Sequence, residues 1–506
     1  MSRSAAEIGA GLAAARPARP IVKGERIHIV GIAGAGASAA GLLAAAAGAA
    51  VTGCDAGGPS PYTAAIEAAG IPIDWLHDPG HVTEGHPGRL AVTKALTAIA
   101  PDHPELVAAR DAGIPLEPWQ QVVADAAAGT GQRLVAIAGT HGKSTTASWL
   151  VATLAGGGRD PSAFVGALLP AAIAGDLGRG NAATARWGSG PEFVVEADEY
   201  AGNFDAFRPS VATLVSVEWD HPDVFPDEDA VIEAFADWIR AAPSATVVAN
   251  LGSPGVQAVL QHLDLPADSV VGFALQGVGD ETVRGSILSE GPEGTAMAID
   301  GIAPDPVRVR LRLTGRHNAS NALAVAATAL ALGAERDAIV AGLESFTGAA
   351  RRLELKGEVG GVAVLDDYGH HPTAIRVTLA ATRQRYPGRR LWAIYEPLTY
   401  HRTAAMLGAF ADVLVGADRV AIADIWAGRD PDTTVTSAAA LADEVNRRRD
   451  GLAIAPGSVE ATAAEVAGQL QPGDVAVVMG GGRSYRIAEL LVEALARSSD
   501  SAAPLD

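Results

Sequence analysis

A strand, a glycine-rich loop and a helix follow one another directly in residues 133–154, and this succession limits the folds that the chain can adopt. Residues 133–138 (RLVAIA) form a short apolar run, GTHGKSTT occupies residues 139–146, and a helical pattern continues to Leu154. Glycines let a backbone approach phosphate groups closely, and the N-terminus of a helix supplies N–H groups and a positive dipole. The segment therefore predicts an α/β domain that binds a nucleotide.

The residues of this loop suit the phosphates of ATP and an accompanying Mg²⁺ ion. Gly142 frees the backbone, Lys143 can neutralise the β- and γ-phosphates, and the Ser144 hydroxyl can ligate Mg²⁺. The general phosphate-loop pattern places its two glycines further apart than they are here, where Gly139 precedes Gly142 by only three positions. The predicted ATP-binding residues of this shorter loop are Gly139, Thr140, Gly142, Lys143, Ser144 and Thr145.

Two later apolar runs end abruptly in acidic residues. Residues 193–199 read FVVEADE, and residues 211–221 read VATLVSVEWDH. Parallel strands deliver such side chains to one edge of a sheet, where carboxylates can hold a metal beside a nucleotide. We expect Glu196 and His221 to join Ser144 as Mg²⁺ ligands, while an ordinary polar loop is the alternative interpretation of His221.

A second glycine cluster lies near the start of the chain. It follows a short apolar strand (26–31), precedes a helical stretch (37–48), and is followed by a second strand (50–55) that ends in an acid. This pattern is typical of a diphosphate-binding turn, but it does not distinguish NAD from a sugar nucleotide, or either from a structural turn. Its key residues are Gly31, Gly34, Gly36 and Asp55.

Strands and helices also alternate in the last third of the chain, where the apolar runs are 361–367, 390–395, 419–424 and 474–479, and the last run leads into three glycines at 480–482. Such alternation predicts a doubly wound α/β sheet. The 506 residues are enough for about three domains. We expect a mobile leader with little to bury at 1–21, a Rossmann-like domain at 22–129, a central ATP-binding domain of phosphate-loop type at 130–348, and a doubly wound C-terminal domain at 349–506.

Composition excludes several classes of protein. A net charge of −20 argues against broad binding to nucleic acid, which needs a basic face. The single cysteine, Cys54, rules out an internal disulfide framework and suits a reducing cytoplasm. Residues 27–53 contain no Asp, Glu, Lys or Arg, but they are rich in Ala and Gly and lack the Leu-rich body of a membrane span, so no span is predicted.

Asparagines open a later apolar helix. In GRHNASN (residues 315–321), Asn318 and Asn321 lie three positions apart and therefore on one helix face. Asparagine at a helix start is first of all a capping residue. Its amide can also pair with the edge of an adenine base, so both residues are candidates for ATP binding.

Taken together, these motifs resemble the Mur ligase family over about residues 26–495. GTHGKSTT, EADEY, the HNxxN segment, RRLE, DDYGHHPT and EPxxYxRT occur in the order typical of that family. The resemblance implies that Arg352 contacts the γ-phosphate and that Asp366 or Asp367 contacts the ribose. It implies a UDP-sugar site at the N-terminal glycine turn, and an amino-acid side of the active site lined by Tyr368, His370, Tyr400 and Arg402. The catalytic residues implied are Lys143, His221, Arg352, His370 and Arg402.

The resemblance further implies an ATP- and Mg²⁺-dependent ligase of peptidoglycan precursor synthesis. DDYGHHPT and YxRT are most similar to members that join L-alanine to UDP-N-acetylmuramate through an acyl phosphate. Glu396 and Leu398 depart from those members, so a recycling ligase that adds L-Ala-γ-D-Glu-meso-diaminopimelate is the alternative. An NAD-dependent oxidoreductase and a nucleotide-binding protein without catalysis are more remote alternatives. A homodimer is one of the assemblies that the sequence permits.

Overall fold

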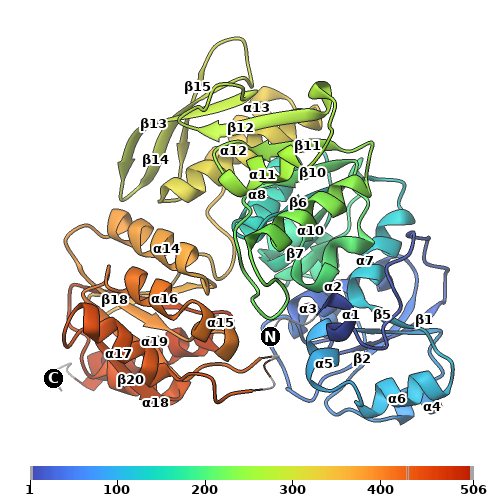
Figure 1. The fold of residues 1–506 in the computed structure, drawn as a ribbon, viewed down its shortest axis with the longest axis horizontal. Coiled ribbons are helices and arrows are strands. Elements are labelled where there is room, and N and C mark those ends of the chain that lie inside the picture. Colours follow the sequence, from blue (N-terminus) through green and yellow to red (C-terminus); the bar gives the residue numbers. More distant parts are fainter. Residues whose placement is uncertain (1–3, 429, 431, 502–506) are drawn as a thin grey trace. The chain divides into compact units, whose positions relative to one another are not determined.

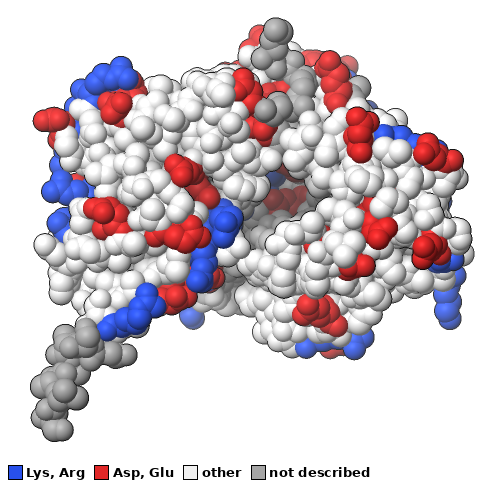
Figure 2. Space-filling model, turned by 90° about the horizontal axis from the view of Figure 1, so that it is seen from below, with Lys and Arg blue, Asp and Glu red and all other residues white. Residues whose placement is uncertain are grey.

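The computed structural model describes residues 4–428, 430 and 432–501. Contacts group the described residues into two compact units, one drawn from residues 1–287, 297–310 and 319–350, the other from 288–296, 311–318 and 351–506. Among the helices of the described residues, none has the length and apolar character needed to cross a membrane. On the face shown in Figure 2, the described Lys and Arg side chains are interspersed with Asp and Glu and form no broad basic patch.

The first unit begins with a five-stranded parallel sheet in the order β3-β2-β1-β4-β5. All residues of its central strand after the first are buried, which explains the apolar run that follows Arg26. The strands are β1 (Arg26–Val30), β2 (Ala50–Cys54), β3 (Ile73–Asp74), β4 (Arg89–Val92) and β5 (Leu116–Pro118); the helices are α2 (Ala35–Ala46), α3 (Thr63–Ala68), α4 (Gly80–Thr83), α5 (Lys94–Ile99), α6 (Pro104–Asp111) and α7 (Trp119–Ala128) (Figure 1).

The segment before this sheet includes the short helix α1 (Ala5–Ile8). Most described side chains of residues 4–21 are exposed or partly exposed, but Ile8 and Ile21 are buried. Ile8 is fully buried against Tyr200, and its carbonyl accepts a hydrogen bond from Thr97 Oγ1 at 2.7 Å. Arg16 Nη2 forms an ion pair with Asp125 Oδ2 at 2.7 Å. These contacts attach the segment to the first unit, and its mobility stays a prediction.

A ten-stranded sheet follows, in the order β15-β14-β13-β12-β11-β10-β6-β9-β7-β8. From β13 to β7 its described pairings are parallel, and the edge strand β8 runs antiparallel to β7. Its strands are β6 (Arg133–Ala138), β7 (Ser162–Leu169), β8 (Ala183–Arg186), β9 (Glu192–Ala197), β10 (Val211–Leu214), β11 (Thr246–Asn250), β12 (Val270–Leu275), β13 (Val283–Gly291), β14 (Gly294–Asp300) and β15 (Val307–Leu311).

Strand β6 lies between β9 and β10, so the carboxyl ends of three parallel strands meet at one edge of the sheet. The glycine loop follows β6 at this edge, and the two acidic segments follow β9 and β10. The accompanying helices are α8 (Lys143–Gly156), α9 (Ala171–Ala174), η1 (Gly175–Gly178), η2 (Tyr200–Ala206), α10 (Glu228–Arg240), α11 (Pro254–Gln261), η3 (Ala267–Ser269), α12 (Arg316–Ala331) and α13 (Arg336–Ser345).

The second unit is built on a six-stranded sheet in the order β16-β17-β21-β18-β19-β20. Only β16 is antiparallel, and Val364, Trp392 and Val478 belong to the apolar core beside the sheet. The strands are β16 (Glu354–Val359), β17 (Val362–Asp367), β18 (Arg390–Tyr395), β19 (Arg419–Ala423), β20 (Ala453–Gly457) and β21 (Asp474–Met479); the helices are α14 (Pro372–Arg385), α15 (Tyr400–Ala405), α16 (Leu407–Leu414), α17 (Ala438–Arg448), α18 (Val459–Ala467) and α19 (Ser484–Ser501).

The tip of the β13–β14 hairpin belongs to the second unit because it is hydrogen-bonded to α14. Gln384 Nε2 donates to the carbonyl oxygens of Gly291 and Gly294 at 3.1 and 3.2 Å, and Gln384 Oε1 accepts from Gly315 N at 2.8 Å. The three sheets confirm the predicted α/β class, with a Rossmann-like sheet, a sheet that carries the phosphate loop, and a doubly wound C-terminal sheet. The residue boundaries proposed for the domains stay predictions.

Candidate active site

The glycine turn after β1 is held in shape by Asp55, the residue that follows β2. Asp55 Oδ2 accepts a hydrogen bond from Ala33 N at 3.1 Å, and Oδ1 accepts one from Gly57 N at 2.8 Å. Gly31 has φ of +78°, a conformation that favours glycine, and its carbonyl accepts from Gly34 N at 3.1 Å. The acid expected to contact a ligand therefore also has a structural role within the turn.

Gly36 lies in the first turn of α2 and has a packing role. A Cβ atom at this position would lie 2.1 Å from Cζ2 of Trp119, so only glycine lets α2 approach this indole. The structure thus brings Gly31, Gly34, Gly36 and Asp55 to one turn at the start of a helix, and diphosphate binding there stays a prediction.

The phosphate loop after β6 is fixed to the residues that follow β10. Gly139 has φ of +142°, and a Cβ atom there would lie 2.7 Å from the carbonyl oxygen of Ser216. Thr140 Oγ1 donates to the carbonyl of Glu218 at 3.1 Å and accepts from Glu218 N at 2.9 Å. Gly142, with φ of +82°, directly precedes α8, so the loop ends at a helix N-terminus as predicted from the sequence.

Lys143 lies at the start of α8 and turns back toward the loop. Its Nζ donates to the carbonyl of Gly139 at 2.6 Å and to Glu199 Oε2 at 2.9 Å. Burial lowers the pKa of Lys143, but the nearby carboxylates of Glu199 and Asp198 outweigh burial, so the net pKa is raised and the side chain is a cation. The loop thus holds a fixed positive charge of the kind that stabilises phosphates.

Ser144 and Glu196 are brought together at the same edge of the sheet. Ser144 Oγ donates to Glu196 Oε1 at 2.9 Å, and Gly166 N donates to Glu196 Oε2 at 2.7 Å. A Cβ atom at Gly166 would lie 2.9 Å from Glu196 Oε1, so the glycine makes room for the carboxylate. Thr145, the last predicted loop residue, is buried in the first turn of α8.

His221 is held in a left-handed conformation beside a second carboxylate. Its φ is +56°, and its backbone N–H donates to Asp220 Oδ1 at 2.6 Å. His221 Nε2 lies 3.7 Å from Glu199 Oε1, and one ligand atom each from Asp198, Glu199 and His221 lie within 4.8 Å of one another. Strained backbone of this kind is often found at functional sites.

Glu199 was absent from the predicted site residues, although it contacts both Lys143 and His221. It is 1% exposed, and burial, together with the neighbouring Asp198, raises its pKa to about 7 against the opposing effect of Lys143. The sequence did contain evidence for Glu199, since this residue ends the same acidic segment as Glu196. Sequence alone did not indicate which acid of that segment would turn toward the lysine.

Asn318 and Asn321 are both buried in the first turns of α12. Asn318 Nδ2 donates to the carbonyl of Thr314 at 2.8 Å, a contact within the helix start. A Cβ atom at Gly142 would lie 2.6 Å from Asn321 Oδ1, so Asn321 packs against the phosphate loop. Adenine recognition by either residue stays a prediction.

In the second unit, the adjacent arginines 351 and 352 both approach Tyr368. The guanidinium carbons of Arg351 and Arg352 lie 5.0 and 4.9 Å from the centroid of the Tyr368 ring. Arg351 also binds Asp366 Oδ2 at 3.1 Å and the carbonyl of Gly480 at 2.8 Å. Arg351, which the sequence did not single out, is thus engaged with the protein itself, beside the predicted γ-phosphate ligand Arg352.

The two aspartates at the end of β17 are both enclosed. Burial raises the pKa of Asp366 to about 6 in spite of its ion pair with Arg351. Asp367 Oδ1 accepts from Gly369 N at 2.8 Å, and Oδ2 accepts from Leu353 N at 2.8 Å. These contacts shape the DDYG turn, and contact of either aspartate with a ribose stays a prediction.

The residues expected on the amino-acid side are only partly brought together. Tyr368 and His370 form an edge-to-face pair with ring centroids 5.3 Å apart. A Cβ atom at Gly481 would lie 3.3 Å from His370 Nδ1 and 2.7 Å from Leu398 Cδ2. The glycine loop after β21, residues 480–482, therefore packs directly beside this pair.

Tyr400 and Arg402 lie on α15, which follows β18. Arg402 is 2% exposed, and its Nη1 donates to the carbonyl of Leu398 at 3.2 Å. Through Leu398 this helix start adjoins the same glycine loop. A role for Tyr400 or Arg402 in binding an amino acid stays a prediction.

Three family models match the chain in succession. They are the Mur ligase family catalytic domain at residues 26–130, the Mur ligase middle domain at 137–329, and the Mur ligase glutamate ligase domain at 351–482. Together with the relatives below, these matches show that the chain belongs to the Mur ligase family.

Two similar curated proteins bear the same name. The UDP-N-acetylmuramate–L-alanine ligase of Clavibacter michiganensis is 38% identical over 95% of this chain and 95% of its own length. The protein of the same name from Roseiflexus sp. is 36% identical over 92% of this chain and 98% of its own length. Both alignments cover more than nine tenths of the chain.

Solved structures share the fold over nearly the whole chain. The UDP-N-acetylmuramate–alanine ligase of Thermotoga maritima matches with a TM-score of 0.75 and 23% identity, over 94% of this chain and 99% of its own. A murein peptide ligase of Psychrobacter arcticus matches with a TM-score of 0.71 and 24% identity over the same shares. Because both identities are low, these two likenesses show the fold alone.

Proposed function

We propose that the chain is an ATP-dependent ligase that joins L-alanine to the carboxylate of UDP-N-acetylmuramate, a step of peptidoglycan precursor synthesis. The observation that carries the proposal is the phosphate loop at the start of α8, where Lys143 and the Ser144–Glu196 pair meet. The curated relatives named UDP-N-acetylmuramate–L-alanine ligase support this acceptor over the tripeptide. No described feature favours the oxidoreductase over the ligase.

The residues around the loop fit a Mg²⁺ ion. Ser144 Oγ and Glu196 Oε1 lie 2.9 Å apart, and both are hard oxygen ligands of the type that Mg²⁺ prefers. Asp198, Glu199 and His221 form a second group of ligand atoms within 4.8 Å of one another. We propose that Ser144, Glu196 and His221 hold the metal, which supplies positive charge beside the phosphates when bound.

The chemistry begins with two anions that must be brought together. A carboxylate oxygen of the muramate attacks the γ-phosphorus, the bond to the β-phosphate oxygen breaks, and ADP leaves. Lys143 offsets the charge on the phosphates, and Arg352 is the second cation that we assign to the γ-phosphate. The neutral amine of L-alanine then attacks the acyl carbon, loses a proton, and expels inorganic phosphate.

We assign the adenosine to Asn318, Asn321 and the aspartates of the DDYG turn, and the UDP-sugar to the turn formed by Gly31, Gly34, Gly36 and Asp55. L-Alanine is assigned to the side chains of Tyr368, His370, Tyr400 and Arg402. The Arg402 guanidinium is the cation proposed for its carboxylate. We further propose that the enzyme acts in the cytoplasm, as three domains with boundaries near residues 130 and 349.

Release of phosphate from ATP tests this function. The enzyme is incubated with UDP-N-acetylmuramate, Mg²⁺ and a panel of amines that contains L-alanine, glycine, L-serine and L-Ala-γ-D-Glu-meso-diaminopimelate. We expect the highest kcat/KM with L-alanine and slow leakage to glycine and serine, because one methyl group changes binding by only about 1–3 kcal/mol. A higher kcat/KM with the tripeptide would assign the chain to peptide recycling instead.

A parallel assay separates the ligase from the remaining alternatives. NAD(P)H absorbance is followed with UDP-N-acetylmuramate and no ATP, where we expect no change. ATP bound without any phosphate release, whichever amine is present, would leave only a nucleotide-binding protein.

A further inference from the structure

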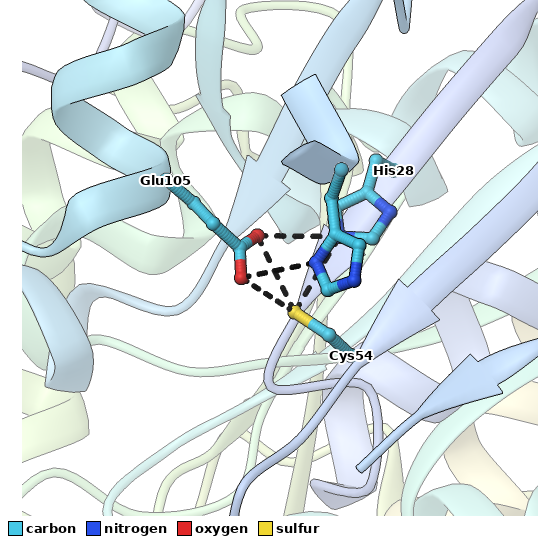
Figure 3. A group of neighbouring side chains, drawn as sticks. His28, Cys54 and Glu105 are labelled. Atoms are coloured by element: carbon cyan, nitrogen blue, oxygen red, sulfur yellow. Dashed lines mark hydrogen bonds and ion pairs between the residues drawn. The ribbon is translucent and has the colours of Figure 1, made fainter. Parts of the chain in front are cut away.

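A buried cluster of histidine, cysteine and glutamate lies in the N-terminal sheet, apart from the residues assigned to the reaction. His28 comes from β1, Cys54 ends β2, His81 lies on α4, and Glu105 lies on α6. Cys54 and Glu105 are fully buried, and His28 is 3% exposed. Figure 3 shows the side chains of His28, Cys54 and Glu105 pointing toward one another. Buried charged groups need a compensating partner, so the cluster requires an explanation.

The spacing of the four side chains suits a small tetrahedral site. His28 Nε2 lies 3.4 Å from Cys54 Sγ and 3.3 Å from Glu105 Oε2, and Cys54 Sγ lies 3.2 Å from Glu105 Oε1. His81 Nδ1 lies 3.3 Å from Glu105 Oε1. All four ligand atoms lie within 4.8 Å of one another. Around a tetrahedral Zn²⁺ with bonds of about 2.0–2.3 Å, neighbouring ligand atoms are about 3.3–3.8 Å apart.

The outer nitrogens of both histidines are also engaged in the way that metal ligands require. His28 Nδ1 lies 2.8 Å from Thr52 Oγ1, and His81 Nε2 lies 3.0 Å from Asp74 Oδ2. A histidine that binds a metal through one ring nitrogen usually bonds through the other to a carboxylate or another oxygen, which fixes ring and tautomer. These contacts leave His28 Nε2 and His81 Nδ1 directed at the cluster.

The chemistry of the four ligands selects the ion. A thiolate and two imidazoles favour zinc over magnesium or calcium, which prefer oxygen ligands. Four protein ligands would close the coordination shell, as in structural rather than catalytic zinc sites. We propose that His28, Cys54, His81 and Glu105 bind one Zn²⁺ ion that joins two strands and two helices of the N-terminal sheet.

The competing interpretation is a metal-free network of hydrogen bonds. Burial, reinforced by the Glu105 carboxylate, raises the pKa of the Cys54 thiol, so without a cation the thiol donates a proton to Glu105. His77 Nδ1, 3.3 Å from both Cys54 Sγ and Glu105 Oε1, is a further donor for that network. The two interpretations differ in a measurable quantity, which is metal bound per chain.

The proposed zinc site is connected to the glycine turn after β1 through Cys54. Cys54 precedes Asp55, and the carbonyl of Cys54 accepts hydrogen bonds from Gly31 N at 2.8 Å and Ile32 N at 3.1 Å. A metal bound at Cys54 would therefore fix the strand end from which the turn begins. Since Zn²⁺ binds the folded site far better than an unfolded chain, its removal must lower the thermal stability of the protein.

The test uses the full chain without a histidine tag. Metal content is measured by inductively coupled plasma mass spectrometry after the protein is stripped with a chelator and reloaded with one equivalent of Zn²⁺. The same apoprotein is titrated with Co²⁺, whose absorption spectrum reports tetrahedral geometry and a thiolate ligand. We expect one Zn²⁺ per chain, a thiolate-to-cobalt charge-transfer band, and a Tm at least about 5 °C lower after chelation.

Two variants and two matched controls assign the site. C54S and E105Q should bind zinc at least tenfold more weakly, and C54S should lose the charge-transfer band. H86N and E84Q, which change exposed residues in the same region, should bind zinc like the parent protein. Asparagine is chosen for His86 because its φ is +44°. The proposal would be overturned if the parent protein showed no charge-transfer band, or if C54S and E105Q bound zinc as tightly as the parent protein. The measurement on the parent protein does not depend on how well either variant folds.

Discussion

Replacement of Glu396 by glutamine should stabilise the second unit at alkaline pH and have little effect at acidic pH. Glu396 directly follows β18, its side chain is 2% exposed, and its Oε2 has no hydrogen-bond partner among the described residues. A Cβ atom at Gly482 would lie 2.9 Å from this oxygen, so the glycine loop after β21 covers it. Burial raises the pKa of Glu396 from its usual 4.5 to about 7, against the opposing effects of hydrogen bonds from Ser484 and Arg483 and the charge of Arg351.

The sign of the effect follows from proton binding. Between pH 4.5 and 7 the unfolded chain has released this proton and the folded chain retains it, so the free energy of unfolding falls as pH rises. A rise in the pKa of Glu396 from 4.5 to about 7 corresponds to at most about 3 kcal/mol in the free energy of unfolding, and this contribution is lost above pH 7. Glutamine resembles the protonated acid and does not titrate. Any fixed cost of its amide is the same at both pH values and cancels in the comparison.

Differential scanning calorimetry of the parent protein and of E396Q at pH 5.0 and pH 8.5 measures the effect. At about 2–4 °C per kcal/mol for a domain of this size, the Tm difference between the two proteins should change by up to about 10 °C in favour of E396Q at pH 8.5. E465Q, which changes an exposed glutamate on α18, is the matched control. Equal Tm differences at both pH values would refute the argument that burial raises the pKa of Glu396 to about 7 in the folded protein.

Three further predictions concern the first unit. K143A should lower kcat for phosphate release by about 10²–10³, the scale of one lost electrostatic contact, and near-normal turnover would contradict the loop assignment. E196A and H221A should each raise the Mg²⁺ concentration needed for half-maximal rate, while calorimetric titration should find UDP-N-acetylmuramate binding unchanged. D125A should leave the buried Arg89, 2.5 Å from the Asp125 carboxylate, without this partner, and so reduce the free energy of unfolding in urea by about 3–5 kcal/mol.

The sequence was most informative where chemistry and chain order coincide. The phosphate loop could be predicted because glycines, a lysine and a serine follow a strand directly, and β6 does pass through that loop into α8 at Lys143. The neighbouring acidic segments could be predicted because parallel strands end at one edge of a sheet. What remained hidden was the direction of individual side chains, as with Glu199, which turns to Lys143 while Glu196 turns to Ser144.

Roles that depend on distant neighbours could not be predicted in the same way. Gly36 matches the diphosphate-binding pattern, yet its lack of a side chain is required by Trp119, which lies far along the chain. Residues 1–21 hold few large apolar side chains, and the sequence alone does not show that Ile8 is buried beside Tyr200. In both cases the deciding contact comes from a separate element that only the folded chain brings close.

The cluster proposed to bind zinc also depends on residues that are distant in the sequence. Its ligands stand at positions 28, 54, 81 and 105, with more than twenty residues between successive members and no short metal-binding motif. The five-stranded sheet makes His28 and Cys54 neighbours because β1 pairs with β2 in a register that sets Thr52 opposite His28. The short helices α4 and α6 then supply His81 and Glu105. Cys54, the single cysteine of the sequence, thereby lies 3.4 Å from His28 Nε2 and 3.2 Å from Glu105 Oε1, spacings that suit the tetrahedral metal site proposed above.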